Sequence, residues 1–347
     1  MHIRFHWRLP QGGDRPGRPD DCSRPDLEEQ IPFCRDAEQL GIDSLLVDFG
    51  LEKADSIVLS TALGVATSKV RFIIAYRSGL LAPTSFVQQL NTLSSLIDGR
   101  ISLNIVAGST PAEQRSYGDF LEHDDRWART DEFLAIARGI WHDGTVDFDG
   151  KFYRVEKARV RTAYTASDGS RAPQIYVGGT SEGARGVAER HADCLLVPAD
   201  VPSRVASSIA PILRKGVEVG VRATVIARRT RKEAVDAAHA FRDSAPAWVH
   251  GPMTQLVERS DSHLLRNAFA NASKEWLTPW LWTGAVETQG AMSILIVGSY
   301  DDVAGALLEY HAAGITQFIL SGWPKREEMQ IFGSEVMGRV RRREEVA

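Results

Sequence analysis

The stretch DDVAGALLEYHAAGITQFILSG, residues 301–322, contains a complete helix-then-strand unit. Its first part is amphipathic and ends on Gly314, and glycine tolerates the left-handed conformation that closes many helices. Residues 316–322 then form a short run of mostly apolar or β-branched side chains, which predicts a buried strand. Such a unit is typical of a parallel sheet whose strands are connected by covering helices.

The same alternation recurs along the chain. Residues 26–41, DLEEQIPFCRDAEQLG, form a second amphipathic stretch that ends on glycine. Strands are predicted at residues 2–9, 43–49, 70–77, 101–108, 174–179, 194–200, 221–229 and 316–322. Eight strands separated by helices predict an α/β fold, a closed (β/α)8 TIM barrel. An open doubly wound sheet is the competing interpretation, but the first strand is followed by a Gly/Pro-rich loop at 10–21 without a GxGxxG turn.

Two insertions interrupt the alternation within a single domain, residues 1–347. Residues 144–162, GTVDFDGKFYRVEKARVRT, predict a hairpin with Asp149-Gly150 as its turn. The stretch from about 245 to 292 is long, irregular and rich in Trp and His. Long irregular insertions in compact domains are usually functional or disordered, and the aromatic content argues against disorder. It predicts a partly helical lid over the barrel mouth; a dimer-packing segment is the alternative.

Composition excludes several classes of function. The 347 residues are 43% hydrophobic and 25% charged, which is ordinary for a globular protein with a sizeable core. A net charge of -4 gives no electrostatic reason to expect nucleic acid or an anionic membrane as a partner. Three cysteines without CxxC spacing argue against a disulfide framework and fit a cytoplasmic location. The histidines lack metal-ligand spacing, so no metal site is expected.

A barrel of this kind places its site at the carboxyl ends of the strands. There, residues 177–190, VGGTSEGARGVAER, end a strand on Gly178-Gly179 and begin a helix after Thr180 and Ser181. Glycine lets a backbone approach a ligand closely, and a helix N-terminus offers free N–H groups and a partial positive charge. The turn is suited to a phosphate; a capped helix without a ligand is the alternative.

Other strand ends carry polar or aromatic residues. Asn104 lies among apolar neighbours and needs a partner, either a ligand or a neighbouring loop. Trp127 precedes a helix expected to begin near Thr130, where it either closes over the mouth or belongs to a capped helix. Trp323 and Lys325 follow the last strand, either as pocket wall and pocket mouth or as a packed ring and a solvated cation.

Taken together, these stretches resemble the bacterial luciferase-like flavin monooxygenases, and within them the alkanesulfonate monooxygenase group. The resemblance covers nearly the whole chain and is strongest over residues 70–133. It implies reduced FMN supplied by a separate NAD(P)H-dependent flavin reductase, a flavin peroxide formed with O2, and a homodimer or homotetramer. By position it implies that the flavin is lined by Tyr76, Asn104, Ser109, Trp127, Gly179, Thr180 and Ser181, the last two at its phosphate.

The departures from the alkanesulfonate group concern the substrate. Arg222 is kept, whereas Thr224 and Lys325 replace histidines, Gln289 replaces a lid arginine, and Trp323 replaces a tyrosine. An indole donates a hydrogen bond but does not deliver a proton in the usual pKa range. The sequence therefore predicts a different arrangement of donors for the substrate than the one that holds a sulfonate.

These residues predict a two-component FMNH2-dependent monooxygenase that oxygenates an organic substrate other than a simple alkanesulfonate. Arg222, Thr224 and Trp323 are the expected catalytic residues, and Arg8, Gln289 and Lys325 are expected to contact the substrate. Three alternatives remain: a desulfonating monooxygenase with shifted roles, a deazaflavin-dependent hydride-transfer enzyme, and a non-catalytic barrel that stores flavin.

Overall fold

The computed structural model describes residues 2–11, 24–108, 110–244, 269–290 and 293–344. Most of the Gly/Pro-rich loop predicted at 10–21 lies outside this range. So do Ser109 and much of the predicted lid, namely residues 245–268 and 291–292. No helix of the described part of the chain is long and apolar enough to cross a membrane.

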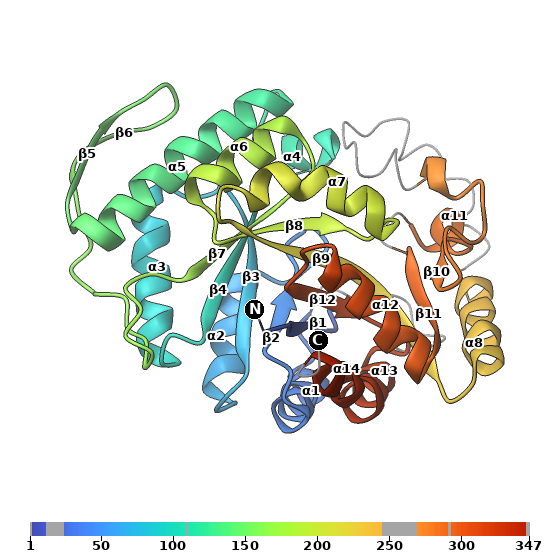
Figure 1. Cartoon of the computed structure of the whole chain (residues 1–347). Helices are drawn as coiled ribbons and strands as arrows, with labels where there is room; N and C mark the ends of the chain where they lie inside the picture. The colour runs from blue at the N-terminus through green and yellow to red at the C-terminus, as the bar shows by residue number, and fades with distance from the viewer. Residues whose placement is uncertain (1, 12–23, 109, 245–268, 291–292, 345–347) are drawn as a thin grey trace.

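Eight parallel strands close into a barrel, which confirms the predicted fold class (Figure 1). The strands in chain order are β1 (Arg4–Arg8), β2 (Ser44–Val47), β3 (Arg71–Arg77), β4 (Ile101–Val106), β7 (Gln174–Gly178), β8 (Cys194–Pro198), β9 (Glu218–Arg228) and β12 (Gln317–Ser321). β9 closes the ring because it pairs with β8 on one side and with β12 on the other, and β12 pairs with β1. Each of these strands overlaps one of the eight predicted segments.

Helices cover the outside of the barrel. They are α1 (Leu27–Leu40), α2 (Ser56–Val65), α3 (Pro83–Leu96), α5 (His123–Asp143), α6 (Glu182–His191), α7 (Pro202–Leu213), α12 (Tyr300–Ala312), α13 (Lys325–Ile331) and α14 (Met337–Glu344), with the short α4 (Pro111–Ser116) at the rim and a π-helical turn at Phe332–Val336. α1 ends where predicted, at Gly41, whose φ of 76° is left-handed. α5 begins at His123 rather than near Thr130, so Trp127 lies within the helix, on its second turn.

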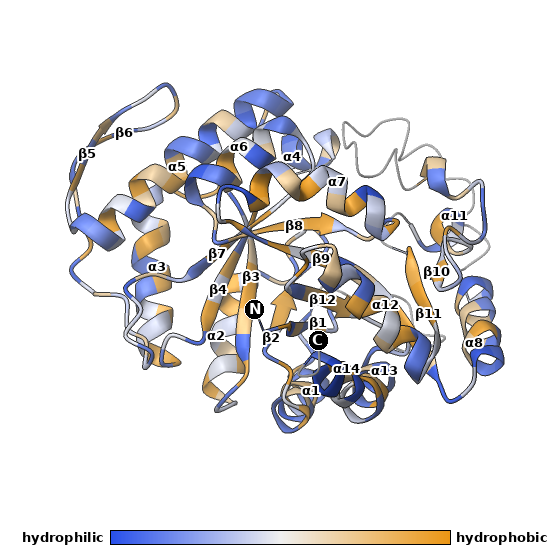
Figure 2. Ribbon diagram, viewed as in Figure 1, coloured by the Kyte–Doolittle hydropathy of each residue, from blue (hydrophilic) through white to orange (hydrophobic). Residues whose placement is uncertain are grey.

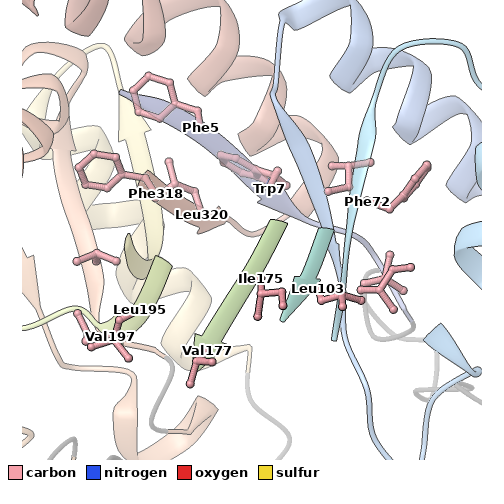
Figure 3. Close-up of a cluster of buried hydrophobic side chains, with 14 of the residues drawn as sticks. Phe5, Trp7, Phe72, Leu103, Ile175, Val177, Leu195, Val197, Phe318 and Leu320 are labelled. Carbon is pink, nitrogen blue, oxygen red and sulfur yellow. The ribbon is translucent and has the colours of Figure 1, made fainter. Parts of the chain in front are cut away.

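Side chains alternate between the two faces of each barrel strand. Outward-facing residues such as Phe5, Trp7, Phe72 and Phe318 are fully buried between strands and helices (Figure 3). Figure 2 shows apolar residues along the barrel strands, with hydrophilic residues over much of the helical surface. This layer is the main core, and it leaves the opposite face of each strand to fill the inside of the barrel.

The barrel interior changes character from one end to the other. Near the amino ends of the strands it holds a polar network in which Gln317 Oε1 accepts from Tyr176 Oη at 2.6 Å and contacts His6 Nε2 at 3.1 Å. The middle is apolar, with Leu46, Ile73 and Ile319 in one buried cluster. The carboxyl ends are polar again. The interior is therefore filled by side chains near the amino ends of the strands, and the candidate site is built from the polar groups at the carboxyl ends.

Two outer strands extend β9 beyond the barrel, and neither was predicted. β9 has 11 residues; Gly220–Thr224 pair with β12, while Thr224–Arg228 pair with β11 (Leu295–Ser299). β10 (Leu281–Trp282) pairs antiparallel with β11, followed by the short α11 (Val286–Gln289). The described part of the predicted lid, 269–290, is thus built around these strands and packs against α8 (Arg231–Asp243), where Trp282 joins Phe241 in a buried cluster.

A two-stranded hairpin occupies the segment predicted for it. β5 (Val146–Asp149) and β6 (Arg154–Ala158) pair antiparallel, and Gly150 N–H donates to Tyr153 O across the connection. The carboxylate of Glu132 on α5 accepts from the backbone N–H groups of the three residues 151–153, at 2.7 to 2.9 Å. The hairpin is therefore tied to α5 and projects away from the barrel (Figure 1).

Candidate active site

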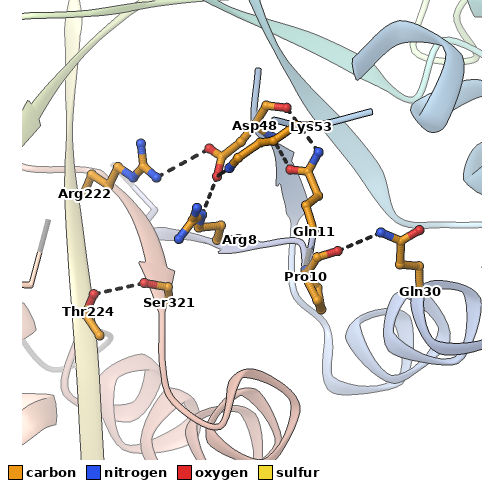
Figure 4. Close-up of polar contacts among 9 residues, drawn as sticks. All are labelled: Arg8, Pro10, Gln11, Gln30, Asp48, Lys53, Arg222, Thr224 and Ser321. Carbon is orange, nitrogen blue, oxygen red and sulfur yellow. Dashed lines mark hydrogen bonds and ion pairs between the residues drawn. The ribbon is translucent and has the colours of Figure 1, made fainter. Parts of the chain in front are cut away.

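Three cations from three different strand ends converge on one carboxylate, that of Asp48. Arg222 Nη2 on β9 lies 3.4 Å from Asp48 Oδ1, Lys53 Nζ lies 3.0 Å from Oδ2, and Arg8 on β1 also contacts Oδ2 (Figure 4). The Asp48 side chain is only 10% exposed, whereas those of the three cations are 21 to 30% exposed. The structure thus brings together Arg8 and Arg222, which the sequence had suggested separately.

Gln11 fixes the backbone at Asp48. Its side-chain oxygen accepts from Asp48 N–H at 2.7 Å, and its amide donates back to Asp48 O at 3.2 Å. Burial by itself raises the pKa of the Asp48 carboxyl, but Arg8, Arg222 and Lys53 together lower it far below its ordinary value. Asp48 is therefore ionised. Gln11 bonds its backbone and the three cations contact its carboxylate, so Asp48 holds the cations near one another.

Thr224 and Ser321 lie beside this cluster. Their hydroxyl oxygens are 3.0 Å apart, on paired positions of β9 and β12 (Figure 4). Trp323 follows Ser321 and is half-buried against Phe241 of α8, with ring centroids 5.7 Å apart. Lys325 is the first residue of α13 and is half-buried. Trp323 thus packs toward the α8 cluster, in line with the packing alternative, while Thr224 faces the barrel interior.

The turn between β7 and α6 borders a cavity of about 480 Å³. Thr180, Ser181 and Arg185 line it from one side, and Asp200 and Arg204 line it from the other, after β8. Ser181 caps α6 by accepting from Ala184 N–H at 3.2 Å. The predicted capped helix is present, and the cap lies on the wall of a cavity that two arginines, Glu182 and Asp200 also line.

Trp127 and Asn104 lie next to the same turn. A Cβ on Gly183 would lie 2.9 Å from the Trp127 side chain, and one on Gly179 would lie 2.7 Å from Ala184 Cβ, so the glycines are needed for close packing. Asn104 is 6% exposed, and a Cβ on Gly178 would lie 3.3 Å from its Oδ1. That oxygen accepts no hydrogen bond from the residues that the structure describes, which is unusual for a buried polar atom.

Two predicted site residues, Tyr76 and Gln289, are not brought to this rim by the described structure. The Tyr76 ring packs outside the barrel against Phe86 of α3, with centroids 4.3 Å apart, because Tyr76 is on the helix-facing side of β3. Gln289 donates to Phe241 O at the end of α8, at 2.9 Å, rather than to a group at the barrel mouth. Ser109 lies outside the described residues.

The sequence places Asp48 at the end of a predicted strand but indicates no role for it, and it does not indicate Lys53 or Gln11 as members of the site. Asp48 follows a buried strand, which is a position that a barrel reserves for functional groups. Its importance depends on contacts with Arg222, 174 residues away, and no spacing rule reveals such a pair. Lys53 and Gln11 lie on loops, where local patterns say little about which way a side chain points.

Comparison with known proteins identifies the family and agrees with the barrel fold. Residues 3–317 match the family described as luciferase-like monooxygenase. The structure of riboflavin lyase with a modified FMN and riboflavin superposes with a TM-score of 0.80 at 19% identity, covering 99% of this chain and 92% of that one.

EDTA monooxygenase from Chelativorans sp. BNC1 gives a TM-score of 0.77 at 19% identity, covering 99% and 94% of the two chains. An F420-dependent secondary alcohol dehydrogenase, in complex with an F420-acetone adduct, gives 0.70 at 18% identity, covering 98% and 99%. These likenesses establish the shared barrel. Because the family match spans most of its length, the chain belongs to the luciferase-like monooxygenase family.

Proposed function

We propose that this protein is a two-component monooxygenase that takes reduced FMN from a separate NAD(P)H-dependent flavin reductase. It uses O2 to oxygenate an organic substrate other than a simple alkanesulfonate. The observation that carries the proposal is the cavity beside the Gly178–Ser181 turn, at the carboxyl end of a barrel from this family. In such barrels this end is where catalysis takes place.

The residues of the cavity suit the phosphate of a flavin mononucleotide. Thr180 offers a hydroxyl, α6 offers N–H groups at its first turn, and Arg185 offers positive charge, whereas Arg204 is paired with Asp200 at 3.3 Å. A phosphate gains most from several charge-assisted hydrogen bonds at a helix N-terminus. We therefore assign the phosphate to the Thr180–Ser181 turn, as the family resemblance implies.

The ring of the flavin would lie toward Asn104 and Trp127. Asn104 Oδ1 is a buried acceptor that accepts no hydrogen bond, and the uracil-like edge of a flavin carries an N–H donor that would satisfy it. Trp127 is 5% exposed and adds an apolar surface beside the glycine turn. When bound, the reduced flavin supplies the electrons for the reduction of O2 that allows oxygen transfer to the substrate.

The substrate would lie between this ring and the Asp48 cluster. Arg222 is held by Asp48, so its guanidinium is positioned to orient an anionic or carbonyl group. Thr224 and Ser321 share a hydrogen bond next to it and offer hydroxyl groups for the reacting part of the substrate. The apolar middle layer below these residues excludes water from that side.

A second candidate is a hydride-transfer enzyme that uses the deazaflavin F420. It is favoured by one specific observation, the similarity of the whole chain to an F420-dependent alcohol dehydrogenase at a TM-score of 0.70. Both cofactors carry a phosphate and a three-ring system, so the cavity suits either. The two candidates differ in whether O2 is consumed, which makes them separable by one experiment.

Stopped-flow spectroscopy tests the proposal. The protein is mixed anaerobically with reduced FMN and then with oxygenated buffer, and the same is done with reduced F420. We expect protein-bound reduced FMN to return to the oxidised state through a transient absorbing species, more slowly than free reduced FMN. Reoxidation at the rate of free FMN, together with retention of reduced F420, would favour the hydride-transfer candidate instead.

The assembly is also a proposal. α2 exposes Val58 and Val65, which are 68% and 61% exposed and lie seven residues apart on one helix face. Exposed apolar side chains on one face are typical of protein contact surfaces. We propose that a homodimer or homotetramer forms through this face; light scattering of the wild type and of the Val58→Asp variant tests it, with a smaller assembly expected for the variant.

A further inference from the structure

Five buried polar atoms on β3, β4 and α4 have no hydrogen-bond partner among the residues that the structure describes. They are Arg77 Nε and Nη2 at the end of β3, Asn104 Oδ1 on β4, and both side-chain amide atoms of Gln114 on α4. The three residues are 2%, 6% and 1% exposed. Unsatisfied buried donors and acceptors destabilise the free protein, so this concentration indicates a site that a ligand completes.

Gly108 brings two of these side chains together. A Cβ on this glycine, whose φ is 84°, would lie 2.9 Å from Arg77 Nη1 and 3.0 Å from Gln114 Nε2. The guanidinium and the amide therefore lie against the same peptide, shortly after β4. Arg77 pairs with Val106, which is two residues after Asn104 and so on the same face of the sheet. The unsatisfied atoms thus belong to one group at the barrel mouth.

Two aromatic rings flank the Arg77 guanidinium. Its Cζ lies 5.0 Å from the centroid of the Phe49 ring and 4.9 Å from that of Tyr117. Phe49 packs against the apolar cluster inside the barrel, so Arg77 borders the interior on that side. Tyr117 follows the short α4 and is 37% exposed, so its ring can move aside for a flat ligand without opening the core. Glu113 Oε1, 3.7 Å from Arg77 Nη2, is beyond hydrogen-bond distance.

The unsatisfied atoms match the dione edge of a flavin. On a guanidinium, Nε and Nη2 carry the two N–H bonds that run parallel along one side, which suits a ligand with two adjacent acceptors. In reduced FMN the N1 atom loses its proton near neutral pH, and the charge is shared with the adjacent C2 carbonyl. Asn104 Oδ1 would accept from the ring N–H, and Gln114 Nε2 would donate to a carbonyl oxygen.

We infer that Arg77 binds the N1 and C2 carbonyl edge of reduced FMN and stabilises its negative charge, with Gln114 beside it. The inference rests on the proposed function, which supplies FMN as the ligand. The phosphate is the same in oxidised and reduced FMN, so the Thr180–Ser181 turn cannot distinguish the two forms. A fixed cation at N1 favours the anionic reduced ring over the neutral oxidised one. Arg77 is therefore the residue that selects the reduced cofactor.

The ionisation of N1 in the bound cofactor tests the inference. Reduced FMN isotopically labelled at N1 is bound anaerobically, and the N1 chemical shift is followed by NMR over a pH series around neutrality. In the wild type we expect N1 to stay deprotonated throughout. In Arg77→Met the pKa of N1 should rise by about one unit or more, and affinity for reduced FMN should fall about tenfold, with little change for oxidised FMN. A purely structural role would weaken both forms alike.

Two further variants complete the test. Arg77→Lys keeps the charge but loses the parallel N–H pair, so its N1 pKa should lie between those of the wild type and Arg77→Met, and it decides the question if Arg77→Met does not fold. Arg71→Met is the matched control, because Arg71 lies at the opposite end of the same strand and donates to Gly99 O and Ile101 O at 3.1 and 3.2 Å. It should behave as the wild type.

Riboflavin, which lacks the phosphate, separates the ring from the rest of the cofactor. Reduced riboflavin should depend on Arg77 as strongly as reduced FMN does; dependence for FMN alone would place the phosphate at Arg77 and overturn the inference. A wild type that binds neither flavin would overturn the proposed function and this inference together. A wild type that binds reduced FMN with N1 titrating as in free solution, or Arg77→Met with the wild-type titration, would overturn the inference alone.

Discussion

Asn104 shows at the scale of one residue how a binding site lowers stability. Its side-chain oxygen is buried and accepts no hydrogen bond, and an unsatisfied buried acceptor costs about 1–3 kcal/mol. An apolar residue of similar shape would avoid that cost. A polar group that weakens the free protein is expected where a ligand completes its hydrogen bonds, and this is why we place the flavin ring there.

The Asn104→Leu variant tests this trade-off. We expect its free energy of unfolding, measured with urea, to rise by about 1 kcal/mol because the unsatisfied oxygen is removed. Its affinity for reduced FMN should fall about tenfold, as measured by anaerobic fluorescence titration.

Asn91 is the matched control for this variant, because both ends of its side-chain amide are hydrogen-bonded. Asn91 Oδ1 accepts from Trp141 Nε1, and Asn91 Nδ2 donates to Thr162 O. Asn91→Leu should lower stability by about 1–3 kcal/mol and leave flavin affinity unchanged. A loss of stability in Asn104→Leu without a loss of flavin affinity would contradict the assignment.

Site residues differed in how far the sequence could predict them. Arg222 and Thr224 were predicted from their positions on a strand that ends at the mouth, and both face the barrel interior. Tyr76 was predicted to line the flavin, but it is one position along β3 from a residue that faces the barrel interior. Because side chains alternate between the two faces of a strand, the Tyr76 ring lies among the helices. Lys53 was not predicted, because its role depends on a loop that brings it back to Asp48.

At the scale of elements, the two glycines of α6 differ in what surrounds them. A Cβ on Gly183 would lie 2.9 Å from the Trp127 ring system, whereas one on Gly186 would meet only the flexible end of Arg190, at 3.5 Å or more. Gly183 is therefore a contact position between α5 and α6, and Gly186 is an ordinary helical site. The contact fixes Trp127 beside the cavity.

Two alanine substitutions on α6 separate these roles. Gly183→Ala should lower the free energy of unfolding by about 1–3 kcal/mol, because Trp127 and the helix must shift to admit the methyl group. Gly186→Ala should be neutral or stabilise the protein by up to about 1 kcal/mol, since alanine has the higher helix propensity. Urea unfolding of both variants is the measurement. Similar losses in the two variants would show that Trp127 packing is not what requires Gly183.

The outer sheet shows which elements sequence patterns do not reveal. β9 was predicted at 221–229 and runs from 218 to 228, because its first half pairs with β12 in the barrel and its second half pairs with β11 outside it. β11 is a five-residue apolar run between an irregular insertion and a helix, and a run that short does not indicate its partner. The barrel strands were predictable because each repeats the same helix-and-strand unit, whereas β10 and β11 follow no repeat.

At the scale of the whole molecule, the two ends of the barrel differ. Side chains fill the barrel near the amino ends of the strands, and the candidate site lies at the carboxyl ends. His6, at 1% exposed, belongs to the lower network and contacts Gln317. Burial lowers the pKa of His6 from 6.5 to about 4, partly opposed by Asp43 and Gln317. The folded protein thus keeps His6 neutral at a pH where the unfolded chain protonates it.

This pKa shift predicts an acid dependence of global stability. The contribution of His6 is complete above pH 6.5 and is lost as the pH falls toward 4, by about 3 kcal/mol in total. His6→Gln should therefore show a flatter decline in unfolding free energy over that interval, measured by urea unfolding at several pH values. His142→Gln, at an exposed position on α5, should keep the wild-type slope. An unchanged slope in His6→Gln would rule out this explanation.

The central claim is that the upper rim of the barrel holds reduced FMN by the Thr180–Ser181 turn. Anaerobic equilibrium titration with reduced and oxidised FMN tests it, using the wild type, Thr180→Val and the control Thr92→Val. The hydroxyl of Thr92 donates to Gln88 O within α3, whereas Thr180 lines the cavity. We predict that reduced FMN binds about tenfold more tightly than oxidised FMN. Of the two variants, Thr180→Val alone should weaken the binding of reduced FMN by a similar factor. Equal affinity for the two forms, or equal behaviour of the two variants, would contradict it.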